Sequence, residues 1–116
     1  MEQSIRTFES GATRDTSQGK LDYEGFLSPI VLKRYAEYMH KNRIQPNGSL
    51  RASDNWQKGI PREEYMKSGF RHFMDWYMEH RNYKGRGDKE ESLCALMFNI
   101  MGYLYEILKE KKYGGK

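Results

Sequence analysis

The chain has 116 residues, of which 37% are hydrophobic, and a formal net charge of +4 at pH 7. This length predicts one domain, residues 1–116, with a modest core. Its single cysteine, Cys94, excludes an intrachain disulfide. The absence of a signal peptide and of an 18-residue apolar run predicts a cytoplasmic protein with no membrane partner.

Residues 1–25 contain few apolar side chains and are predicted to form an extended N-terminal arm. Two of its segments, Gly11-Ala12-Thr13-Arg14-Asp15 and Gly19-Lys20-Leu21-Asp22, place a glycine near a cation. Such segments let backbone amides and a positive side chain approach a phosphate together, although the Walker spacing is absent. Two interpretations stay open, a solvated or strapping arm and a phosphate-binding one.

A first helix is predicted over residues 28–43, with Ser28 as the N-cap and Pro29 in the first turn. The turn signal Pro46-Asn47-Gly48 follows it. In the connector after this turn, Trp56 either covers one end of the core or stacks on the ring of a ligand.

A second helix is predicted over residues 61–82, beginning at Pro61. Its apolar residues recur at helical spacing, which predicts a stripe that faces the core. They are Met66, Phe70, Phe73, Met74 and Tyr77. Ser68, His72, Asp75 and Glu79 share the opposite face, which either meets water or forms a site.

A third helix is predicted over residues 88–112, capped by Asp88 together with Glu91. Its apolar stripe is again expected to face the core and consists of Leu93, Met97, Ile100, Met101, Leu104, Ile107 and Leu108. On another face, small residues surround Asn99, so a dimer partner or a bound ligand is expected to approach there. Cys94 is expected to be an inert packing residue.

The predicted fold class is therefore all-α, with three main helices plus an extended N-terminal arm. Because the chain is lean in hydrophobic residues, we expect the fold to be completed by oligomerisation, most simply as a homo-oligomer.

The second helix is also the place where groups able to do chemistry collect. Asp75 and Glu79, joined by Glu90 and Glu91 from the third helix, would form an oxygen-rich set of metal ligands. Such ligands prefer Mg²⁺ or Mn²⁺ bound jointly with substrate phosphates, whereas the residues required for a zinc site are missing. This chemistry fits hydrolysis of a phosphate anhydride, with Arg71 stabilising the developing charge.

Several blocks occur in an order that resembles a known family. They are Gly11-Ala12-x-Arg14-Asp15, Gly19-Lys20-x-Asp22, Asp54-Asn55-Trp56-x-Lys58-Gly59-Ile60-Pro61, Arg71-His72-x-x-Asp75-Trp76, His80-Arg81, Leu93-Cys94-Ala95, Phe98-Asn99 and Gly102-Tyr103-Leu104. The series, from about Phe8 to Lys109, resembles the phage dATP/dGTP diphosphohydrolase N-terminal-domain proteins, which lie near the all-α nucleoside triphosphate pyrophosphohydrolases of the MazG type.

The resemblance implies a protein of an infected or lysogenic bacterial host that cleaves a purine dNTP to the monophosphate and pyrophosphate with Mg²⁺ or Mn²⁺. The expected catalytic residues are Arg71, His72 and Asp75, and the expected metal ligands are Asp75, Glu79, Glu90 and Glu91. The expected substrate-binding residues are Arg14, Lys20, Asn55, Trp56, Lys58 and Asn99. MazG-type enzymes usually carry Glu-x-x-Glu on one helix and Glu-x-x-Asp on the next, and this chain does not reproduce that quartet.

Three hypotheses follow. The first is a metal-dependent purine dNTP pyrophosphohydrolase, and the second is a protein that binds or sequesters a nucleotide, such as a signalling nucleotide, without catalysis. The third, ranked last and motivated by the basic isoelectric point and the aromatic residues, is a small nucleic-acid-binding protein. The mild positive charge suits a nucleotide as well as it suits nucleic acid, so charge alone does not exclude nucleic acid, which is the disfavoured partner.

Overall fold

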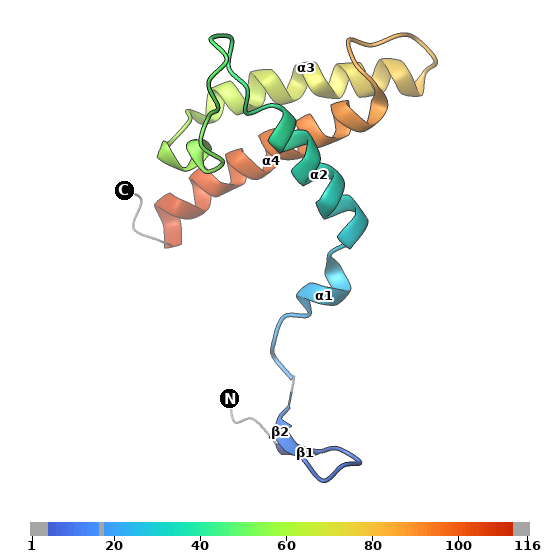
Figure 1. Ribbon diagram of the computed structural model, residues 1–116, viewed down its shortest axis with the longest axis vertical. Helices are drawn as coiled ribbons and strands as arrows, with labels where there is room; N and C mark the ends of the chain where they lie inside the picture. The colour runs from blue at the N-terminus through green and yellow to red at the C-terminus, as the bar shows by residue number, and fades with distance from the viewer. Residues whose placement is uncertain (1–4, 17, 113–116) are drawn as a thin grey trace.

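The structure is a computed structural model that describes residues 5–16 and 18–112, the last of these by its backbone alone. It is mostly helical, with one small two-stranded sheet, so the predicted helical class is confirmed (Figure 1). The elements in chain order are β1 (Ile5–Thr7), β2 (Thr13–Asp15), α1 (Tyr23–Phe26), α2 (Pro29–Lys41), η1 (Asn55–Lys58), α3 (Arg62–His80) and α4 (Lys89–Lys112). None of the described helices has the length and hydropathy that crossing a membrane requires.

The arm is more ordered than the sequence predicted. Strands β1 and β2 pair antiparallel, with Arg6 opposite Arg14. Gly11 lies in the turn between them with a φ of +91°, and its amide donates to the carbonyl of Phe8 over 2.9 Å. The first glycine segment therefore closes a hairpin, which projects away from α3 and α4 (Figure 1).

The helix ends follow the predicted capping residues. The Ser28 hydroxyl accepts a hydrogen bond from the Val31 amide over 3.4 Å at the start of α2. Asp88 accepts one from the Glu91 amide over 2.7 Å at the start of α4. Pro61 stands one position earlier than predicted, as the N-cap of α3.

Helices α3 and α4 form an antiparallel hairpin joined by the short loop 81–88, and they make the most extensive contact in the molecule (Figure 1). Small residues on both helices permit this close approach. A Cβ added to Gly69 would lie 3.2 Å from the Cβ of Asn99, and one added to Gly102 would overlap the ring of Tyr65. In the contact between the two helices, Tyr65 and Gly69 of α3 therefore pack against the small-residue face of α4.

This packing overturns the predicted core. Phe70 is 62% exposed and Ile100 is 58% exposed, and most of the other members of the two apolar stripes are exposed or half-buried as well. The prediction that these stripes form the core within one chain is wrong. The faces with glycine, alanine and serine meet instead, because they bring the two backbones closer than aromatic stripes could.

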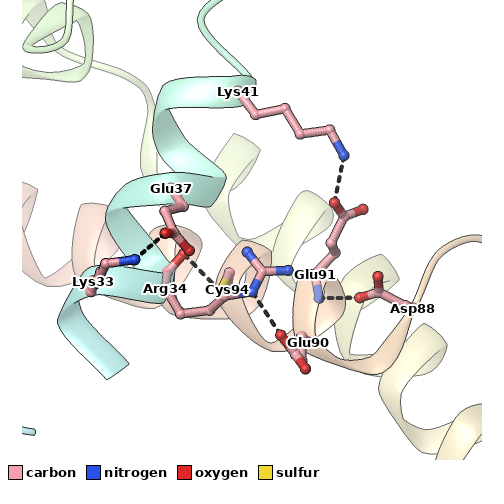
Figure 2. A network of polar contacts seen from close by, with 8 residues as sticks. All are labelled: Lys33, Arg34, Glu37, Lys41, Asp88, Glu90, Glu91 and Cys94. Atoms are coloured by element: carbon pink, nitrogen blue, oxygen red, sulfur yellow. Dashed lines mark hydrogen bonds and ion pairs between the residues drawn. The ribbon is translucent and has the colours of Figure 1, made fainter. Parts of the chain in front are cut away.

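Helix α2 crosses the first half of α4 (Figure 1). Figure 2 shows the polar contacts at this crossing, in which Arg34 pairs with Glu90 over 2.7 Å and Lys41 with Glu91 over 2.6 Å. Beneath them Cys94 is buried, with its Sγ 4.0 Å from the Arg34 carbonyl oxygen. Burial raises the pKa of the Cys94 thiol, so the predicted packing role fits this position.

Candidate functional site

The strongest candidate site is an open groove of about 530 Å³ on the outer side of α3. Its lining residues, which we call the cation-lined groove, are Lys67, Phe70, Arg71, Met74, Asp75 and Arg86. Three cations and one carboxylate give the groove a net positive charge. An aromatic ring, Phe70, lies among them and is exposed. This combination suits a ligand that is anionic at one end and flat and apolar at the other.

Asp75 anchors the groove. Its side chain is only 11% exposed, and it is held by Arg86 from the loop between α3 and α4. Nε of Arg86 donates to both carboxylate oxygens, over 3.2 and 2.9 Å, and Nη2 lies 2.8 Å from Oδ2. The hydrogen bonds from Arg86 lower the pKa of Asp75, so this carboxylate is ionised at neutral pH.

His72 lies one helical turn before Asp75. Its Nδ1 is 3.9 Å from Oδ2 of Asp75, beyond hydrogen-bond distance. Burial lowers the pKa of His72, and the positive charge of Arg86 lowers it further. The imidazole is therefore neutral at pH 7 and has a nitrogen free to accept a proton.

The carboxylates expected to hold a metal do not converge. Glu79 accepts a hydrogen bond from the Gly85 amide over 2.8 Å, and Asp75 is paired with Arg86. Glu90 and Glu91 turn toward α2, where they pair with basic side chains (Figure 2).

These four carboxylates consequently do not fit the expected Mg²⁺ or Mn²⁺ site as the chain arranges them. Within residues 5–16 and 18–112, the structure contains no group of three or more His, Cys, Asp or Glu side chains positioned to share a metal ion.

The expected catalytic residues are brought together only in part. Arg71, His72 and Asp75 come from one stretch of α3, and Arg71 and Asp75 line the groove while His72 lies beside Asp75. Arg14 lies in β2 and Lys20 follows it in the arm, which lies away from α3 (Figure 1).

The remaining expected substrate-binding residues lie outside the groove. Asn55, Trp56 and Lys58 belong to η1, which packs near the C-terminal half of α4, with the Trp56 ring 4.7 Å from that of Tyr105. Asn99 is buried between α3 and α4 and donates to the Ala95 carbonyl over 2.8 Å, so its amide nitrogen has an internal partner.

Sequence reasoning missed two lining residues, Lys67 and Arg86. Lys67 lies one turn before Arg71 on the same face of α3, so helical spacing alone could have identified it. Arg86 lies in a segment that reads only as a basic turn. Its position follows from the antiparallel arrangement of α3 and α4, because the short loop must fold back over the last turns of α3.

Comparison of the chain with protein-family models, with curated proteins and with solved structures found no match.

Proposed function

We propose that this protein binds a purine nucleoside triphosphate in the cation-lined groove. The observation that carries the proposal is that Lys67, Arg71 and Arg86 line one groove together with the exposed ring of Phe70. Guanidinium groups pair with phosphate oxygens through two parallel hydrogen bonds, and a phenyl ring gives a base a face to stack on.

Arg71 is the side chain best suited to the phosphates. Arg86 is already engaged with Asp75, whereas Arg71 is exposed and has no hydrogen bond or ion pair to another described residue. In this arrangement Asp75 fixes Arg86 at the side of the groove.

The reaction that the family resemblance implies is hydrolysis of dATP or dGTP to the monophosphate and pyrophosphate with Mg²⁺ or Mn²⁺. A second candidate, nucleotide binding without turnover, is favoured by the engagement of Asp75, Glu79, Glu90 and Glu91 with protein partners. Binding through the three cations needs no metal, so the two candidates differ in their dependence on divalent ions.

The test measures affinity by calorimetry and pyrophosphate release for each of the four dNTPs, with Mg²⁺, with Mn²⁺ and with EDTA. We expect dATP or dGTP to bind. Arg71→Ala should weaken binding at least tenfold, because a hydrogen bond to a charged group contributes about 1.5–3 kcal/mol. Arg62→Ala, an exposed arginine at the other end of α3, is the matched control and should change affinity less than twofold.

Pyrophosphate release only with a divalent ion would identify the hydrolase, and binding in EDTA without release would identify the sequestering protein. Equal affinity of Arg71→Ala and the unchanged chain would contradict the groove as the site. Tighter, salt-sensitive binding of an oligonucleotide than of any dNTP would favour the nucleic-acid hypothesis instead.

A further inference from the structure

A single chain leaves an unusually large surface exposed. Its accessible area is 9722 Å², whereas a compact monomer of this mass exposes about 6,600 Å². Its Cα radius of gyration is 19.6 Å, against about 13 Å for a compact domain of this length. The buried hydrophobic residues of the described chain are only Tyr65, Cys94 and Ala95.

Part of the exposed area is apolar and lies on one side of the α3–α4 hairpin. We call Met66, Phe73, Tyr77, Ile100 and Leu104 the apolar face; each is between 41 and 58% exposed. At 100° per residue, the three residues of α3 fall within about 40° of one another, as do the two of α4. On each helix, these residues follow the residues of the α3–α4 contact in the same direction around the helix axis. Because the two helices run antiparallel, the two sets therefore lie on the same side of the hairpin.

The rings on this face already contact one another. Phe73 stacks on Tyr77 with the ring planes at 8° and the centroids 6.2 Å apart. The ring of Phe73 also meets that of Trp76 edge to face, with the centroids 5.9 Å apart. On the α3 side the face is thus a cluster of rings and not a scatter of single exposed residues.

The apolar face borders the cation-lined groove along α3. The ring of Phe70, which lines the groove, meets that of Phe73 edge to face with the centroids 6.3 Å apart. The cations of the groove point elsewhere, since Arg71 lies about 160° around the helix axis from Phe73. Helix α2 covers α4 at Cys94, about 100° around the helix axis from Ile100 and Leu104. The contact with α2 and the cations of the groove therefore leave the apolar face open.

We propose that the apolar face binds the same face of a second copy of this chain, so that two α3–α4 hairpins form a four-helix bundle. A two-fold symmetric dimer would bury this face on both copies, because each copy presents the same patch to the other. Apolar stripes spaced for helix packing would then form the shared core of the bundle.

The lack of an internal core favours a second copy over an occasional partner. A stable interface buries about 800 Å² from each chain. Part of the excess exposure comes from the N-terminal arm, which projects away from α3 and α4 (Figure 1), but the described part of the hairpin itself buries only Tyr65, Cys94 and Ala95 among its hydrophobic residues. A chain with so small an internal core needs this cover whenever it is folded, and its own copy is the partner present wherever it is made.

The test compares solution mass by light scattering for the unchanged chain and two variants, over 2–200 µM. We expect the unchanged chain to have twice the monomer mass of 13.8 kDa, and its thermal midpoint to rise with concentration. Ile100→Glu combined with Leu104→Glu should give the monomer mass and raise the dissociation constant at least 100-fold, because each glutamate would be buried unpaired. Ile44→Glu, at an isoleucine that is 64% exposed outside this face, is the matched control and should keep the dimer.

A monomer at 200 µM with a concentration-independent thermal midpoint would overturn the proposal without reference to any variant. The double variant retaining the dimer mass would overturn it as well. This proposal does not rest on nucleotide binding, since none of the substituted residues lines the groove. Loss of nucleotide affinity in Arg71→Ala and loss of dimer mass in the glutamate variant are therefore separate results.

Discussion

At the scale of single residues, the Asp75–Arg86 pair joins the end of α3 to the loop that follows it. Asp75 is almost fully buried and Arg86 is half exposed. Arg86→Ala should lower the free energy of unfolding, because the buried carboxylate would lose its principal donor. Urea unfolding monitored by circular dichroism measures this change.

Lys84→Ala, in the same loop, should change the free energy of unfolding by less than about 0.5 kcal/mol and serves as the control. Adding Asp75→Asn to Arg86→Ala should restore part of the loss, because the buried charge is removed together with its partner. If the Arg86→Ala variant were as stable as the unchanged chain, the Asp75–Arg86 pair would not stabilise the fold.

His72 gives the fold a dependence on pH. Because its folded-state pKa lies below its ordinary value near 6.5, the unfolded chain binds a proton more readily. This contribution to stability is fully present above about pH 6.5, the unfolded-state pKa, and is lost as the pH falls from there through the lower folded-state pKa. The thermal midpoint should therefore fall between pH 7 and pH 5, and His72→Gln should flatten the fall.

Asp75 acts in a separate, more acidic window. Its lowered pKa stabilises the fold above the ordinary aspartate pKa, and this contribution is lost as the pH falls below about 4. Equal slopes between pH 7 and pH 5 in His72→Gln and the unchanged chain would contradict the assignment to His72.

At the scale of helices, the contact between α3 and α4 depends on Gly102. A methyl group there would lie 2.6 Å from the hydroxyl oxygen of Tyr65 and closer still to its ring carbons. Gly102→Ala should therefore destabilise the fold by about 1–3 kcal/mol through overpacking, although alanine favours a helix over glycine by about 1 kcal/mol. Thermal unfolding measures the net effect.

Gly87→Ala is the matched control, because a methyl group at that position would meet its nearest neighbour at an ordinary 3.8 Å. It should leave the thermal midpoint within about one degree. If Gly102→Ala were more stable than the unchanged chain, its helix propensity would outweigh the contact, and the close approach of the two helices would be wrong.

The helix ends were predictable because their signals are local. Ser28 and Asp88 cap α2 and α4 through hydrogen bonds that span three residues, so they need no knowledge of the rest of the fold. The direction of each helix face was not predictable in this way. Periodicity identifies an apolar stripe on a helix but not the surface against which that stripe packs. In this chain α3 and α4 contact each other through their small-residue faces, at Gly69 and Gly102.

At the scale of the whole molecule, the candidate site could be predicted only where its residues share one helix. Arg71, His72 and Asp75 are within one turn of each other, so helical geometry alone places them together. Arg86 enters through the fold of a loop, and η1 carries Asn55 and Trp56 toward the other half of α4. The order of the motifs along the sequence could not show which of these residues lie together in the fold and which only match the order of the resembled family.

The order of α2, α3 and α4 along the chain also constrains the order in which these helices can meet. Helix α2 packs on α4, which is synthesised about seventy residues later. At 5–20 residues per second, the ribosome needs about 4 to 14 s to make that interval. During this time α2 is outside the ribosome without its binding surface, while α3 and α4 are neighbours in sequence and pair as soon as the second of them emerges. We therefore expect the α3–α4 hairpin to form before α2 docks on it, so that α2 adds to a preformed surface.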